Sequence, residues 1–174
     1  MHKRLWLLLT VLFLLESTVL PWLIPVAWQT RILVTPHFVL VIVLFIGLYM
    51  NRHTSLLYGL IFGMLNDIIH YSPMLGPIAF SMGLTGYMAG LMSGRVYSSI
   101  MVSMLVIALG NLGYEAIIFG LYRLFRITHL DFQWVFLHQM LPSMLINLLF
   151  ALAVYVPLRK LFESHAIPST SAEE

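Results

Sequence analysis

The chain is 174 residues long, and 60% of these are hydrophobic while only 9% are charged. An ordinary soluble domain has about 25% charged residues, so this composition indicates an integral membrane protein and excludes a separate soluble domain. The net charge is only +2, and the basic residues stand at the ends of apolar segments rather than in one patch, which argues against nucleic acid as a partner. There is no cysteine, so disulfide and thiolate chemistry are excluded as well.

The apolar segments are continuous, which favours helices over a membrane β-barrel. Barrel strands alternate apolar and polar residues, whereas residues 7–15 are interrupted only by Thr10. At about 20 residues per span, five or six helices fit in the chain. We therefore expect an all-α, polytopic membrane helical bundle of about six transmembrane helices. It forms one domain over residues 1–163, and the polar C-terminal tail, 164–174, is expected to be disordered.

The first predicted span covers residues 5–20. A basic start before a leucine run is also typical of a signal peptide, but no small-x-small cleavage site follows and Glu16 interrupts the run. We interpret it as an uncleaved helix. Pro21 ends this helix and begins a connector that extends to Thr35.

The next four spans are predicted from the turn residues between them. They cover residues 35–50, with Thr35 as the cap and Pro36 at the first helical position, then 55–70, 78–92 and 100–121. Three of them are near the lower length limit of about 17 residues, so a re-entrant segment is an open alternative.

The remaining sequence contains one more span. Residues 122–134 mix apolar and aromatic residues with two arginines, a histidine and an aspartate, which indicates an amphipathic segment at the membrane interface. The last span covers residues 135–158 and contains Pro142, where we expect a kink that neighbouring helices accommodate.

The distribution of lysine and arginine predicts the orientation. Six of these residues fall on the side of the N-terminus and three on the other side: Lys3, Arg4, Arg52, Arg95, Arg159 and Lys160 against Arg31, Arg123 and Arg126. Cytoplasmic connections carry the excess of positive charge, so both termini are expected in the cytoplasm.

Three acidic residues, Glu16, Asp67 and Glu115, lie inside apolar stretches. A carboxylate near the middle of a span costs about 2.5 to 3.5 kcal/mol, so each needs a partner, a cavity or a proton. Each acid lies late in an outward-running span, and we predict that they form one group in the outer half of the bilayer. Arg123 or Arg126 is the expected cationic partner. The alternative is that the acids only hold the bundle together through hydrogen bonds.

Polar side chains also recur at helical spacing on two later spans. Asn111 shares a face with Glu115, and Gln139, Ser143 and Asn147 form a stripe at i, i+4 and i+8. We expect both rows to face inward, and Asn147 joins the three acids as a candidate functional residue.

Glycines form two rows at spacings of three or four residues. Gly59 and Gly63 lead up to Asp67, while the fourth span carries the row Gly83, Gly86, Gly90 and Gly94. Small residues at this spacing let two helices approach closely, so these faces serve either internal packing or a partner helix.

Catalytic and metal motifs are not found. An aspartyl intramembrane protease needs two membrane aspartates, and only Asp67 qualifies; no GxSxG motif is present. His70, His129 and His138 lack the HxH or HExxH spacing of a metal site. We expect no enzymatic activity, no cofactor and no metal.

Several short motifs together resemble the family of the rod shape-determining protein MreD, over nearly the whole chain. They are Leu-Leu-Glu16-Ser17, Tyr58-Gly59-x3-Gly63-x3-Asp67, Leu75-Gly76, Gly113-Tyr114-Glu115 with Gly120, Pro142-Ser143-x-Leu145-x-Asn147 and Val156-Pro157-Leu158-Arg159. No single motif is specific; their order, spacing, chain length and span count carry the resemblance.

The resemblance implies a non-enzymatic subunit of the bacterial cell-elongation machinery in the inner membrane. Its implied partners are the bitopic protein MreC, the actin-like MreB and, through them, the RodA glycosyltransferase and its penicillin-binding protein. The implied fold is similar to the substrate-capture (S) component of energy-coupling-factor transporters, which would place a pocket on the outer side.

Two functions therefore compete. A scaffold offers a lipid-facing groove to a partner helix and organises peptidoglycan synthesis. A transporter or capture protein instead encloses a small molecule or a lipid head group among the polar faces around Glu16, Asp67, Glu115 and Asn147. Whether the chain's own helices cover the glycine row of the fourth span distinguishes the two.

Overall fold

The computed structural model describes residues 2–18, 35–92 and 100–163, and every regular element in these ranges is helical. The predicted all-α fold is thereby confirmed for the described residues, while the predicted disordered tail, 164–174, lies outside them. The helices are α1 (His2–Thr18), α4 (Phe38–Tyr49), α5 (Arg52–Ile69), α6 (Pro77–Leu91), α8 (Ile100–Leu124), α9 (Phe132–Val135), the π-helical η1 (Phe136–Met140) and α10 (Leu141–Glu163).

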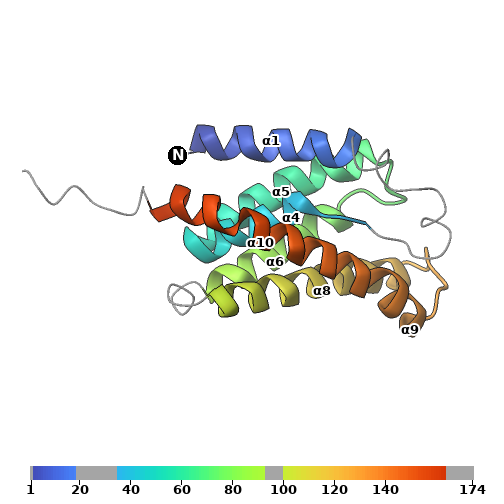
Figure 1. Cartoon of the computed structure of the whole chain (residues 1–174). Coiled ribbons are helices and arrows are strands. Elements are labelled where there is room, and N and C mark those ends of the chain that lie inside the picture. The colour runs from blue at the N-terminus through green and yellow to red at the C-terminus, as the bar shows by residue number, and fades with distance from the viewer. Residues whose placement is uncertain (1, 19–34, 93–99, 164–174) are drawn as a thin grey trace, which may run out of the picture.

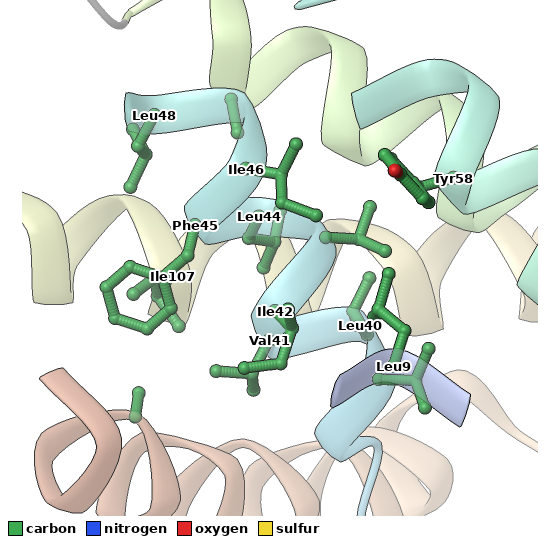
Figure 2. Close-up of a cluster of buried hydrophobic side chains, with 14 of the residues drawn as sticks. Leu9, Leu40, Val41, Ile42, Leu44, Phe45, Ile46, Leu48, Tyr58 and Ile107 are labelled. Carbon is green, nitrogen blue, oxygen red and sulfur yellow. The ribbon is translucent and has the colours of Figure 1, made fainter. Parts of the chain in front are cut away.

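Helix α4 lies at the centre of the bundle. It contacts α1, α5, α6, α8 and α10, and Figure 1 shows it enclosed among them. Its sequence, FVLVIVLFIGLY, has no polar face, as expected for a helix that is buried on all sides. Every residue from Val39 to Leu48 is buried, and Figure 2 shows its side chains packing toward Leu9, Tyr58 and Ile107.

Helix lengths differ widely within the bundle. Among the described residues, two helical stretches are long and apolar enough to cross a membrane: Ile100–Leu124 and the continuous run Phe132–Phe162. The apolar part of α1 and all of α4 are shorter. The twelve residues of α4 extend about 18 Å at 1.5 Å per residue, less than a hydrocarbon core of about 30 Å. The count of six full spans stays a prediction.

The glycine rows lie in contacts between the chain's own helices. A Cβ atom added at Gly63 of α5 would lie 2.5 Å from the Cα of Ala79 in α6, and one at Gly59 would lie 2.8 Å from the Cα of Gly83. These distances leave no room for a side chain, so glycine is what lets α5 and α6 touch along their backbones.

The glycines further along α6 are covered as well. A Cβ at Gly86 would lie 2.5 Å from the Ser55 hydroxyl, and one at Gly90 would lie 2.6 Å from the Cα of Arg52. The chain's own helices cover the described glycines of this row, so the glycine groove that the scaffold interpretation expected is closed here and a partner surface has to lie elsewhere on the bundle. Gly94 lies outside the described residues.

The structure moves several predicted boundaries. Helix α4 begins at Phe38 rather than at residue 35 or 36, and α8 extends to Leu124. Residues 125–131 are not helical, so the predicted amphipathic segment is mostly a connection. Pro142 is the second residue after the π-helical turn η1. Proline lacks an N–H and its ring clashes with the carbonyl four residues back, here within η1, and the wider turn accommodates it.

Candidate functional site: a buried polar cluster at the start of α4

The first turn of α4 is buried, so its free backbone N–H groups need partners from other helices. Glu16, in the last turn of α1, accepts a hydrogen bond from the Val39 N–H through Oε2 at 3.1 Å. Asn147 of α10 accepts one from the His37 N–H through Oδ1 at 2.8 Å. The N-terminus of a helix carries partial positive charge, so a carboxylate is favourable at this position. Glu16 thus caps a helix to which it is not connected locally.

His37 lies between two carboxylates. Its Nδ1 is 3.6 Å from Oε1 of Glu16, and its Nε2 is 3.4 Å from Oε1 of Glu115. Both contacts are ion pairs when the imidazole is protonated. The ring also meets the ring of Tyr114 edge to face, with centroids 4.9 Å apart. His37 therefore links α1 and α8 at the point where the chain enters α4.

Glu115 has two further polar neighbours. The Thr35 hydroxyl donates to its Oε1 at 3.4 Å, and the Gln139 amide donates to its Oε2 at 3.4 Å. Both distances are long for hydrogen bonds, so these contacts are weak individually. The Thr35 N–H in turn donates to Ser143 Oγ at 3.1 Å. The carboxylate of Glu115 is therefore surrounded by groups that can donate hydrogen bonds to it.

The amide stripe completes the cluster. The Asn147 amide donates to Asn111 Oδ1 at 2.7 Å, and the Asn111 amide donates to the Ile107 carbonyl at 2.9 Å. Asn111, Ser143 and Asn147 are all buried. The inward direction predicted for both polar rows is confirmed. We call the set Glu16, Thr35, His37, Asn111, Glu115, Gln139, Ser143 and Asn147 the α4 cap cluster.

Asp67 caps a different helix, α6. Its Oδ2 accepts hydrogen bonds from the backbone N–H groups of Gly76 and Ala79, both at 3.1 Å. It therefore caps the start of α6 from the preceding helix, α5. Of the three acids predicted to form one group, Glu16 and Glu115 meet at His37, whereas the hydrogen bonds described for Asp67 go to the start of α6. The physical reason is that two buried helix starts, each with free N–H groups, require a carboxylate.

The predicted cationic partner also needs correction. Arg123 and Arg126 are exposed, and the Arg123 guanidinium lies 6.0 Å from the centre of the Phe119 ring. Among the described residues the cation that reaches Glu115 is His37, which the sequence interpretation did not single out. One signal was available: a histidine directly before an all-apolar helix, at the depth predicted for the acids. Because the helix was predicted to start at Pro36, His37 was assigned to its first turn and was not considered as a partner for the acids.

The cluster is closely packed, and most of its polar atoms bond one another. Glu16 and Glu115 are 8% and 6% exposed. A few buried atoms have no hydrogen-bond partner in the part of the chain that the structure describes: Ser17 Oγ, His37 Nδ1, Asp67 Oδ1 and Tyr114 Oη. No group of three possible metal ligands occurs among the described residues. The arrangement can hold a proton between His37 and two carboxyl groups, and it ties four helices together.

Comparisons with known proteins give one consistent result. The family model described as rod shape-determining protein MreD matches residues 1–165. The curated rod shape-determining protein MreD of Bacillus subtilis (strain 168) is 27% identical over 129 residues, which are 74% of each chain. No solved structure matches this chain. The resemblance to the S component of energy-coupling-factor transporters therefore stays a prediction.

Proposed function

Because the chain belongs to the MreD family of rod shape-determining membrane proteins, we propose that it is a non-enzymatic scaffold in the inner membrane. In this role both termini are cytoplasmic, and the helices bind an MreC-like protein with a single membrane span. Through that partner the chain is linked to an MreB-like actin and to a RodA-type synthase with its penicillin-binding protein.

One observation favours a scaffold over a capture protein. The polar side chains that would line a pocket, Glu16, Glu115 and Asn147, are bonded to backbone and side-chain groups of the same chain. A capture protein needs such groups directed into open space to bind its ligand. Here they stabilise the bundle instead, and the surfaces left for partners are apolar helix faces.

Helix α5 offers a well-defined face of this kind. It packs Gly59 and Gly63 against α6 and exposes a row of large apolar side chains: Leu57, Leu60, Ile61, Met64, Leu65 and Ile68. Lipid and a partner helix are equally apolar, so this row gains no hydrophobic free energy by exchanging one for the other. Specific binding then depends on side-chain packing rather than on apolar burial.

Co-purification tests the scaffold. The full chain and a tagged single-span partner are expressed together, and the amount of chain retained on the partner is measured. We expect wild-type protein to be retained and Ile61→Trp with Ile68→Trp to lose retention while still accumulating. The matched control, Leu149→Trp with Val156→Trp on the exposed face of α10, should be retained. Failure of the wild-type chain to bind the partner would refute the scaffold.

Cysteine labelling tests the orientation, because the chain has no cysteine of its own. Leu75, in the exposed turn between α5 and α6, should react with a membrane-impermeant maleimide from outside when changed to cysteine. Asn51, between α4 and α5, should react only after the membrane is opened. The reverse pattern would place the α4 cap cluster in the inner half of the bilayer.

A further inference from the structure

A cationic pocket lies just beyond the end of α8. It has a volume of about 400 Å³ and is lined by Arg123, Arg126, Thr128 and His129. Its lining contains two guanidinium groups and an imidazole but no carboxylate. Among the described residues neither arginine forms an ion pair with an acid; the Arg123 guanidinium lies over the Phe119 ring. The charges in this pocket are therefore available to a ligand.

The backbone at Arg126 is in an unusual conformation for this residue type. The Ile127 N–H donates to the Tyr122 carbonyl at 2.8 Å, and the Arg126 N–H donates to the Arg123 carbonyl at 3.1 Å. This pair of bonds is the Schellman motif, which ends a helix with a residue in the left-handed region. Arg126 has φ +56° there, where glycine is the usual residue.

The helix dipole accounts for the position of only one of the two arginines. Arg123 lies in the last turn of α8, where a cation is favourable. Arg126 lies beyond the helix, in a backbone conformation that is costly for any residue with a side chain. The helix dipole therefore does not explain why an arginine occupies this position. Residues other than glycine in this conformation cluster at ligand-binding sites, where the surrounding structure maintains the strain.

The segment that carries the pocket is suited to a membrane surface. Exposed large apolar side chains neighbour the lining residues in the sequence: Leu124, Phe125, Ile127, Leu130 and Phe132. Apolar groups at this position can enter the acyl-chain boundary while the arginines stay at head-group level. By the predicted orientation the pocket lies on the side with fewer lysines and arginines, so positive charge here is not explained by topology.

We propose that this pocket binds the phosphate group of an anionic lipid. Guanidinium groups donate paired hydrogen bonds to phosphate oxygens, and the two of them more than balance the single negative charge of one phosphodiester. The Thr128 hydroxyl already accepts a hydrogen bond from the Leu130 N–H at 3.4 Å and keeps its own proton to donate. This binding is independent of the scaffold role, because it uses neither the α4 cap cluster nor the exposed face of α5.

Native mass spectrometry of the full chain in detergent tests the site, with phosphatidylglycerol as the probe and phosphatidylcholine as the reference lipid. Arg123→Gln and Arg126→Gln should each weaken phosphatidylglycerol binding about tenfold, since each removes a hydrogen bond from a charged donor. The matched control is Lys160→Gln, which removes an exposed cation at the other end of the bundle and should bind as wild type does.

Arg126→Gly separates binding from folding. Glycine relieves the left-handed conformation, so this variant should melt no lower than wild type and still lose phosphatidylglycerol. Competition by inorganic phosphate at millimolar concentration would show that the phosphate group alone is recognised; its absence would show that the acyl chains contribute, and both support the site. Equal phosphatidylglycerol binding by wild type and Arg123→Gln/Arg126→Gln would overturn it, as would equal weakening by Lys160→Gln.

Discussion

The polar contacts at the two ends of α4 differ in chemistry. At its start, the first N–H groups bond Glu16 and Asn147, and His37 lies between two carboxylates. At its end the polar groups are hydroxyls: Tyr49 Oη lies 3.3 Å from Ser103 Oγ and 3.3 Å from Tyr155 Oη. The buried helix is thus held by anions at one end and by neutral groups at the other.

The difference follows the polarity of the helix. Partial positive charge at the start favours carboxylates, and partial negative charge at the end favours cations. The guanidinium of Arg159 donates to Tyr155 Oη at 3.4 Å, so a cation stands behind the hydroxyls. The start of α4 is buried, so neighbouring helices supply its polar partners. Charge-assisted contacts at the start should contribute more than neutral contacts at the end.

The largest effect is expected at the start of α4. Glu115→Leu leaves His37, Thr35 and Gln139 without their shared partner, and breaking a buried pair in this way costs about 3–5 kcal/mol. Glu115→Gln keeps an acceptor and should cost less. Thermal unfolding of the purified chain in detergent measures both. Leu109→Ala, on the exposed face of the same helix, serves as the control and should change stability by about 0.5 kcal/mol or less.

A smaller effect is expected at Asp67, which caps α6 and forms no ion pair with a cation among the described residues. Asp67→Ala removes the acceptor of two N–H groups and should cost about 0.5–2 kcal/mol. Asp67→Asn keeps an acceptor of nearly equal capping strength and should be close to wild type. The same unfolding assay compares them. If asparagine were as damaging as alanine, the negative charge rather than the cap would be the feature that matters.

The smallest effect is expected at the end of α4. Tyr49→Phe removes long hydrogen bonds but keeps the ring, which stacks on Phe162 with centroids 5.8 Å apart. The expected cost is about 0.5–1.5 kcal/mol, the usual range for a neutral hydrogen bond. A loss as large as that of Glu115→Leu would remove the distinction between the two ends.

Sequence reasoning predicted the helices better than their surroundings. The apolar run of α4 indicated a span, but a helix covered by protein and one covered by lipid both require apolar residues all round. Periodicity therefore did not reveal that α4 is central. The inward direction of Asn111 and Asn147 followed from spacing alone, because polar side chains avoid lipid.

The candidate site was predicted in part for a similar reason. The depth of Glu16 and Glu115 followed from the orientation of their spans, so their meeting was foreseeable. The separate role of Asp67 was not, because it depends on where the backbone of α6 begins relative to α5. His37 was missed because its position relative to the acids is set by tertiary packing and not by any local pattern.

His37 joins Glu16 and Glu115 at the start of α4, and a double-mutant cycle is the most direct test of this contact. Unfolding free energies are measured for wild type, His37→Gln, Glu115→Gln and the double variant. If the two side chains interact as the structure shows, the cost of the double variant should differ from the sum of the single costs by about 1 kcal/mol or more. Additivity within about 0.5 kcal/mol would mean that His37 and Glu115 are independent, which would contradict a stabilising contact between them.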